Sequence, residues 1–240
     1  MKIFAFIPAR SGSKGVKNKN IKKINKIPLI NYSIDFAVRS NIFDKIIVST
    51  DSKKIYNIAK KAGAETPFLR PKKYSKDNST DYDVFNHFIK WSIENNQTIP
   101  DLICHLRPTT PVRSINTLIK TLNIMKQNKK FSCLRTVIPS NFSPYKIWAI
   151  NKKNFMEPLI KSSKPLHSMG RQSLRKTFKH VGYIDIIRTK ETILKKSITG
   201  NKIYPFILSE RDVKHFVDID NYSDFKNAKK IVSENQWLVK

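Results

Sequence analysis

Residues 2–15 read Lys-Ile-Phe-Ala-Phe-Ile-Pro-Ala-Arg-Ser-Gly-Ser-Lys-Gly, a short apolar run that passes directly into a basic loop. An apolar run of this length without polar alternation predicts a strand that is buried on both faces. Similar runs lie at 46–49, 102–106, 131–137, 182–187 and 203–208. Helical patterns lie at 30–40, 52–62, 81–94, 115–125 and 222–232. Strands that alternate with helices predict an α/β fold, in which helices cover both faces of a parallel sheet.

The polar loops that follow three of these strands begin at Arg10, Thr50 and Arg107. Sheets of this kind bind their ligands beyond the carboxyl ends of the strands. We therefore expect the three loops to converge on one site.

Residues 138–180 interrupt the alternation of strands and helices. Pro139, Pro144, Pro158 and Pro165 break up this stretch, so no long helix or strand is expected in it. We interpret it as an inserted arm within a single domain of residues 1–240, and as a candidate subunit contact.

The composition is strongly basic, with 46 Lys and Arg against 18 Asp and Glu and a formal net charge of +28. Such a charge favours polyanionic partners, among them nucleic acid and acidic membranes. Many of the lysines occur in pairs spread along the chain, without a zinc-finger or basic-zipper pattern. We interpret the charge mainly as solvated surface and predict no nucleic acid and no membrane as partner. A basic nucleic-acid-binding protein stays open as the alternative from another functional class.

No apolar run reaches the roughly 18 residues that suggest a transmembrane helix. The first run ends at Pro8 without a small-residue cleavage site, which argues against a signal peptide. Cys104 and Cys133 are too few for a disulfide framework. We therefore expect a cytoplasmic protein.

The loop after the first strand has the residues that a phosphate site needs. Gly12 and Gly15 let backbone N–H groups approach an anion, Ser13 adds a hydroxyl donor, and Arg10 and Lys14 supply positive charge. The loop matches neither the Walker A pattern nor the dinucleotide fingerprint. On these residues alone, a triphosphate site and a flexible exposed turn are about equally compatible with it.

Asp218 and Asp220 stand two residues apart in Phe216-Val217-Asp218-Ile219-Asp220. In an extended segment this spacing turns both carboxylates to one face, where a bridging Mg²⁺ would relieve their repulsion. The alternative is that Asp220 or Asn221 caps the helix that follows. Taken alone the cap explains the pair, and a neighbouring phosphate loop would favour the metal.

Taken in order, these residues resemble the acylneuraminate cytidylyltransferase family, the CMP-sialic acid synthetases. The blocks that carry the resemblance cover nearly the whole chain and are Ile7–Lys14 with Lys19-Asn20, Val48–Asp51, Leu69–Pro71, Leu106–Arg113, Ser143–Lys146, Arg171-Gln172, Gly182-Tyr183 and Val217–Asp220. The resemblance implies a Rossmann-like, mostly parallel sheet flanked by helices, with an inserted dimerisation arm at 138–180 that closes the neighbour's site in a homodimer.

The resemblance also implies roles for individual residues. Those expected at the nucleotide are Arg10, Ser13, Lys14, Lys19, Asn20, Arg70, Ser79 and Asp81. Those expected at the sugar acid are Arg107, Thr109, Thr110, Lys146, Arg171 and Gln172. Asp218 and Asp220 are expected to hold Mg²⁺ and to act with Arg10 and Lys14 as the catalytic groups.

The expected reaction joins CMP from CTP to a sialic-acid-like nonulosonic acid and releases pyrophosphate. Two departures from the family pattern concern the sugar: Arg107-Pro108 stands where many relatives have Gln-Pro, and Val181-Gly182 where the family often has Asn-Gly. Enzymes for pseudaminic or legionaminic acid, and the CMP-Kdo synthetases for an eight-carbon sugar acid, remain alternatives.

Overall fold

The computed structural model describes residues 1–235. The chain folds into two compact units. The first comprises Met1–Thr136 and Val181–Lys240, and the second comprises Val137–His180. Among the described residues, no helix is long and apolar enough to cross a membrane.

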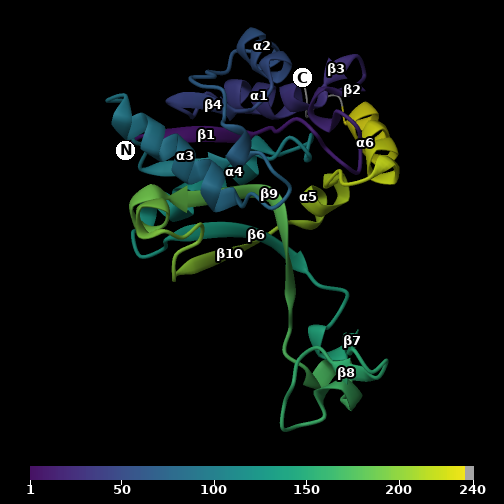
Figure 1. Cartoon of the computed structure of the whole chain (residues 1–240). Helices are drawn as coiled ribbons and strands as arrows, with labels where there is room; N and C mark the ends of the chain where they lie inside the picture. The colour runs from purple at the N-terminus through teal and green to yellow at the C-terminus, as the bar shows by residue number, and fades with distance from the viewer. Residues whose placement is uncertain (236–240) are drawn as a thin grey trace. The chain divides into compact units, whose positions relative to one another are not determined.

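A six-stranded sheet forms the centre of the first unit, with the order β10-β6-β9-β5-β1-β4 (Figure 1). Its strands are β1 (Ile3–Pro8), β4 (Lys45–Ser49), β5 (Leu102–His105), β6 (Cys133–Pro139), β9 (Phe178–Arg188) and β10 (Ile203–Ile207). β1 pairs in parallel with β4 and with β5, whereas β9 pairs antiparallel to β5. The mostly parallel α/β sheet predicted from the apolar runs is confirmed, and β9 is the strand whose direction those runs did not reveal.

The helices begin at capping side chains in most cases. They are α1 (Leu29–Ser40), α2 (Lys53–Lys61), α3 (Asp81–Glu94), α4 (Ile115–Gln127), α5 (Glu210–His215) and α6 (Tyr222–Glu234). Thr80 caps α3 and Asn221 caps α6, each in a capping box with an acidic residue three positions on. The short α5 and the hairpin of β2 (Lys23–Ile24) with β3 (Ile27–Pro28) were not predicted.

The second unit consists mainly of turns. It contains a small hairpin of β7 (Trp148–Ile150) with β8 (Met156–Pro158) and the 3₁₀ turns η3 (Pro144–Lys146), η4 (Leu166–Ser168) and η5 (Arg171–Ser173). Its bounds differ by one residue from the 138–180 predicted for the arm.

Among the described residues, hydrophobic clusters join distant parts of the first unit. One packs Phe4 and Phe6 of β1 against Phe85 and Phe88 of α3. The other contains buried residues from segments far apart in sequence, namely Val16, Leu29, Val112, Val217, Ile219 and Phe225. Because burial of these side chains is the main force that joins them, the second cluster brings the loop after β1 to the segment before α6.

Candidate active site

The loop after β1 is held by its own polar residues. The backbone N–H and hydroxyl of Ser11 donate to Asp51, at 2.7 and 2.6 Å. The Asn20 amide donates to the Arg10 carbonyl at 2.8 Å. Gly12 has φ of +66°, a left-handed conformation that glycine adopts without strain. These hydrogen bonds define the course of the loop.

The segment that carries the aspartate pair lies against this loop. The Ile219 N–H donates to the Thr109 carbonyl at 3.0 Å, and the Lys19 ammonium bonds to the Ile219 carbonyl. A Cβ on Gly15 would lie 1.9 Å from the Asp220 backbone oxygen, so only glycine allows this approach. Opposite ends of the chain therefore meet at one place, as the metal-and-phosphate hypothesis requires.

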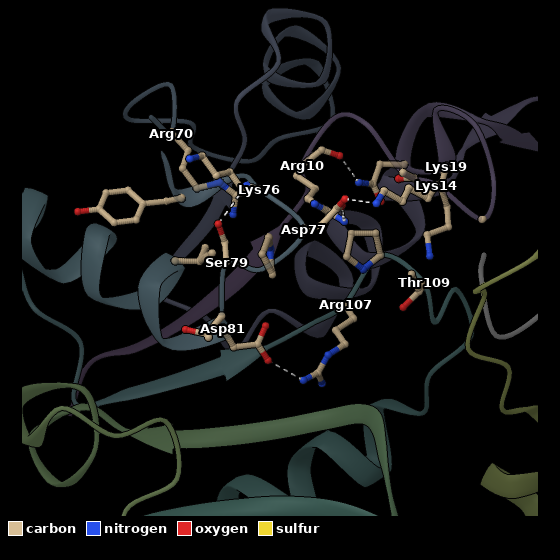
Figure 2. A pocket seen from close by; sticks show the side chains of 18 of the residues that line it. Arg10, Lys14, Lys19, Arg70, Lys76, Asp77, Ser79, Asp81, Arg107 and Thr109 are labelled. Atoms are coloured by element: carbon tan, nitrogen blue, oxygen red, sulfur yellow. Dashed lines mark hydrogen bonds and ion pairs between the residues drawn. The ribbon is translucent and has the colours of Figure 1, made fainter. Parts of the chain in front are cut away.

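A cleft of about 420 Å³ opens between these segments (Figure 2). It lies entirely within the first unit. The predicted site residues that line it are Arg10, Ser13, Lys14, Lys19, Asn20, Arg70, Ser79, Asp81, Arg107, Thr109 and Asp220. The loops after β1 and β5 thus converge on one site.

The predicted nucleotide side of the cleft is strongly cationic. The guanidinium of Arg70 is almost fully buried, which lowers its pKa to about 10, and its Nε donates to Ser75 Oγ at 3.1 Å. The carboxylate of Asp77 bridges Arg10 Nη2 at 2.8 Å and Lys14 Nζ at 2.5 Å. Hydrogen bonds from Lys14 and Arg10 lower the pKa of Asp77, so it is ionised at neutral pH.

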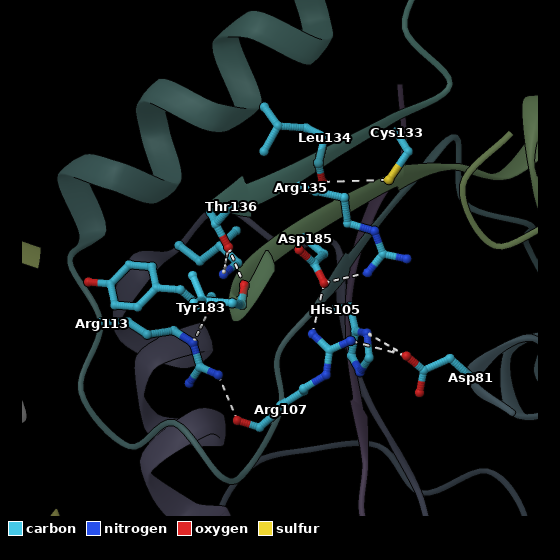
Figure 3. Close-up of polar contacts among 12 residues, drawn as sticks. Asp81, His105, Arg107, Arg113, Cys133, Leu134, Arg135, Thr136, Tyr183 and Asp185 are labelled. Atoms are coloured by element: carbon cyan, nitrogen blue, oxygen red, sulfur yellow. Dashed lines mark hydrogen bonds and ion pairs between the residues drawn. The ribbon is translucent and has the colours of Figure 1, made fainter. Parts of the chain in front are cut away.

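On the opposite wall, Arg107 belongs to a chain of ion pairs (Figure 3). Its Nη1 lies 2.8 Å from Asp185 Oδ2, and its Nη2 lies 3.1 Å from Asp81 Oδ2. Arg135 reaches the same Asp185 oxygen at 2.6 Å. Burial lowers the pKa of Arg107, but the two carboxylates outweigh it and raise that pKa overall. Gly182 passes under this side chain, where a Cβ would lie 2.7 Å from Arg107 Cδ.

His105 lies beside this ion-pair chain and is completely buried. Its ring stacks edge-on against Phe85, and neither ring nitrogen has a hydrogen-bond partner within the part of the chain described. Its Nδ1 lies 4.0 Å from Asp81 Oδ2, too far for a hydrogen bond. Burial and then the charge of Arg107 lower the pKa of His105 to about 3, so the imidazole stays neutral.

This neutral histidine should make the fold sensitive to acid. The unfolded chain binds the proton at a pKa near 6.5 and the folded chain only near 3, so stability falls as the pH drops through that window. We expect His105 to account for about 2 kcal/mol of the stability lost between about pH 7 and pH 5. Denaturant unfolding at both pH values should therefore show a smaller loss in His105→Leu than in the wild type. Equal losses in the two proteins would contradict the assignment.

The remaining predicted residues lie outside the cleft lining. Thr110 is fully buried beneath the loop after β5, and its hydroxyl has no hydrogen-bond partner in residues 1–235. Asp218 is half-buried. Its negative charge acts to raise the pKa of the nearby Arg113 guanidinium. Lys146, Arg171 and Gln172 belong to the second unit, and their contact with a sugar acid stays a prediction.

Arg113 fixes the backbone that carries Arg107 and Thr109. The Arg113 side chain is buried and donates to the carbonyls of Arg107, Thr110 and Tyr183. It also donates to Ser33 Oγ at 3.0 Å. A guanidinium has five N–H donors in one plane and can reach these acceptors together, whereas the ammonium group of a lysine could not.

The sequence reading missed three features of the site. Asp77 lies in a polar loop that offers several carboxylates and hydroxyls. His105 is the last residue of the fully buried strand β5, and Asp185 is the only charged residue in the apolar run 182–187. An isolated charge within a buried run indicates a buried partner. That signal could have identified the contact between Asp185 and a cation.

The aspartate pair suits a divalent ion by its donor chemistry. Val217 and Ile219 are buried, whereas Asp218 is half-buried and Asp220 is exposed. Asn221, and not Asp220, is the N-cap residue of α6. In residues 1–235 no cluster of three metal-ligating side chains is present. Two carboxylates suffice for Mg²⁺, which commonly completes its shell with water and substrate phosphates.

Comparison with known proteins gives a consistent result. A family model described as cytidylyltransferase matches residues 4–179. The flagellin modification protein B of Campylobacter coli is 32% identical over 238 residues, covering 99% of this chain and 98% of that protein. The CMP-N,N'-diacetyllegionaminic acid synthase of Campylobacter jejuni is 32% identical over 231 residues, covering 96% and 95%.

A solved structure of CMP:2-keto-3-deoxy-manno-octonic acid synthetase in complex with CTP shares the fold. Its TM-score is 0.69 at 14% identity, over 98% of this chain and 99% of that one. At this identity the likeness establishes architecture alone. The family match, the relatives that span the whole chain and the cleft together identify the chain as an enzyme of the cytidylyltransferase family.

Proposed function

We propose that this enzyme transfers CMP from CTP to a nonulosonic acid, a nine-carbon 2-keto sugar acid, and releases pyrophosphate. The observation that carries the proposal is the single cleft in which the basic loop of Lys14 faces the segment of Asp220. Relatives that match over nearly their whole length are named CMP-N,N'-diacetyllegionaminic acid synthase, which supports the nucleotide and the class of sugar.

The nucleotide side of the reaction rests on positioning and charge. Arg10 and Lys14 stand where they can neutralise the pyrophosphate that leaves, while Ser13 and Asn20 line the same part of the cleft. Transfer of a phosphoryl-type group needs little covalent help from a protein, because its barrier is lowered mainly by alignment and by compensation of charge. Arg70, Ser79 and Thr80 line the neighbouring wall, which we assign to the cytidine.

We assign the wall of Arg107 and Thr109 to the sugar acid. The guanidinium of Arg107 is held at one end by the buried Asp185 and meets Asp81 at the open end. A substrate carboxylate or hydroxyl that approaches Nη2 competes with Asp81. Asp81 therefore acts on this wall in our proposal, rather than at the cytidine.

Asp218 and Asp220 would hold Mg²⁺ in this scheme. The bound ion would supply positive charge to polarise the α-phosphate. Lys19 lies 3.6 Å from Asp220 Oδ1 and holds that segment in place through the Ile219 carbonyl. The cytoplasm, which supplies CTP, is the compartment that fits the reaction.

The arm is proposed as the contact of a homodimer. The second unit exposes large apolar side chains, with Phe142 77%, Ile150 71%, Phe155 68% and Met156 64% exposed. An apolar surface of this kind is typical of a protein interface. We expect sedimentation analysis to give twice the chain mass, and Phe155→Asp to shift the protein toward the monomer. A wild-type monomer at micromolar concentration would contradict this proposal.

A pyrophosphate-release assay tests the activity directly. Each of the four nucleoside triphosphates is combined with a panel of sialic, legionaminic and pseudaminic acids and Kdo, with and without Mg²⁺. We expect release with CTP and at least one nonulosonic acid, and none after chelation of the metal. Release with Kdo alone would move the enzyme to the eight-carbon class, and no release with any pair would reject the proposal.

A further inference from the structure

Within the cleft, the Asp77 carboxylate lies between two cations, in the place of an anionic ligand. Each of its carboxylate oxygens faces a different cation, Oδ1 toward Arg10 Nη2 at 2.8 Å and Oδ2 toward Lys14 Nζ at 2.5 Å (Figure 2). Arg10 and Lys14 are also the two cations of the predicted phosphate loop. A tetrahedral phosphate with two such oxygens would meet the same pair of donors.

The contact is built so that it can open. Asp77 sits at the tip of a turn that is held by other bonds, from Lys76 N to Ser79 Oγ at 3.0 Å and from Ser79 N to the Lys76 carbonyl at 3.1 Å. The side chains of Asp77 and Lys14 are 47% and 79% exposed. Exposed ion pairs are weak, so the carboxylate can leave the two cations without unfolding its turn.

We propose that Asp77 is an internal competitor for the polyphosphate subsite, which the triphosphate of CTP must displace and which returns as pyrophosphate leaves. The inference rests on the proposed function, since it assigns Arg10 and Lys14 to the polyphosphate. Because Asp77 is tethered beside the two cations, it competes at a high effective concentration. Weak monoanions are then kept off the loop, whereas a ligand with several negative charges displaces the carboxylate.

The same competition must weaken the binding of substrate and product alike. The apparent dissociation constant of a ligand for this subsite equals the intrinsic constant divided by the fraction of time for which the subsite is open. Asp77 therefore raises the KM for CTP and also speeds the release of pyrophosphate. A ligand without phosphates, such as cytidine, does not reach the subsite and is unaffected.

Binding of inorganic pyrophosphate by calorimetry, without metal or sugar acid, tests this directly. We expect Asp77→Asn and Asp77→Ala to bind pyrophosphate about 3- to 10-fold more tightly than the wild type. Product inhibition by pyrophosphate should tighten by a similar factor, while cytidine binding stays the same. Unchanged or weaker pyrophosphate binding in both variants would overturn the proposal.

Glu191→Gln is the matched control. Glu191 pairs with Lys195 at the same 2.5 Å, neither residue lines the cleft, and the substitution removes the same single negative charge. It should leave pyrophosphate affinity unchanged, which separates a local effect from one of net charge. If the wild type turns over CTP but the Asp77 variants bind pyrophosphate no more tightly, only this inference fails. A wild type that neither turns over CTP nor binds pyrophosphate would reject both.

Discussion

Gly15→Ala should lower kcat/KM for CTP by about 100-fold. The new Cβ would lie 1.9 Å from the Asp220 carbonyl oxygen and 3.1 Å from its carbon. Both contacts are with backbone, which cannot swing aside as the end of a flexible side chain can. The basic loop and the aspartate segment must therefore separate, and a displacement of about 1 Å between catalytic groups is enough for a loss of this size. Initial rates of pyrophosphate release at varied CTP measure it.

Gly200→Ala separates this effect from a general disturbance of folding. A Cβ on Gly200 would lie 2.6 Å from Ser132 Cβ and 2.8 Å from the Glu191 carbonyl oxygen, a clash outside the cleft, and Gly200 has a positive φ that disfavours alanine. That variant should melt at a lower temperature while its folded fraction keeps the wild-type KM for CTP. Wild-type kinetics in Gly15→Ala would show that the contact between loop and segment has no part in catalysis.

Asp220→Asn should reduce kcat by more than about 100-fold at saturating CTP and Mg²⁺. Removal of residues that merely support a metal ligand typically costs about 10- to 100-fold, so loss of a ligand charge should exceed that range. The fold should survive, because the Asp220 side chain is 80% exposed and α6 is capped by Asn221. Titration of the rate with Mg²⁺ should also show a weaker apparent affinity for the metal.

Asp224→Asn provides the comparison for Asp220. Asp224 accepts the N–H groups of Asp220 and Asn221 at 2.9 and 3.0 Å, so its role is to cap the helix. Its substitution should cost about 1 kcal/mol of stability while Mg²⁺-dependent turnover persists. If both variants lost stability and kept turnover, Asp220 would be a capping residue and the metal hypothesis would be wrong.

Local sequence patterns predicted the strands and helices well where burial decides the structure. The apolar runs at β1, β4 and β5 have no polar alternation because both faces of these strands are covered. The same pattern says nothing of direction, so the antiparallel pairing of β9 with β5 could not be read from it. The helix α5 has only six residues, too few to show a periodic pattern.

The sequence predicted those charged groups of the site that lie close together in one loop. Lys14 and Asp220 were placed together by their chemistry, and the cluster of Val16 with Val217 and Ile219 explains why they meet. The role of Asp77 was not predictable, because its contact with Arg10 depends on how a loop more than sixty residues away folds back. Lys146, Arg171 and Gln172 lie in the second compact unit, so their contact with a sugar acid stays a prediction.

The buried guanidinium of Arg113 has a consequence for how substrate preference can change. It binds backbone carbonyls on both sides of Thr109, so the path of this loop is set by a buried residue that does not line the cleft. The side chains at 107 and 109 can then be exchanged while their Cα positions stay where they are. On the proposed assignment of Arg107 and Thr109 to the sugar acid, a scaffold of this kind would let substrate preference change by one substitution at a time.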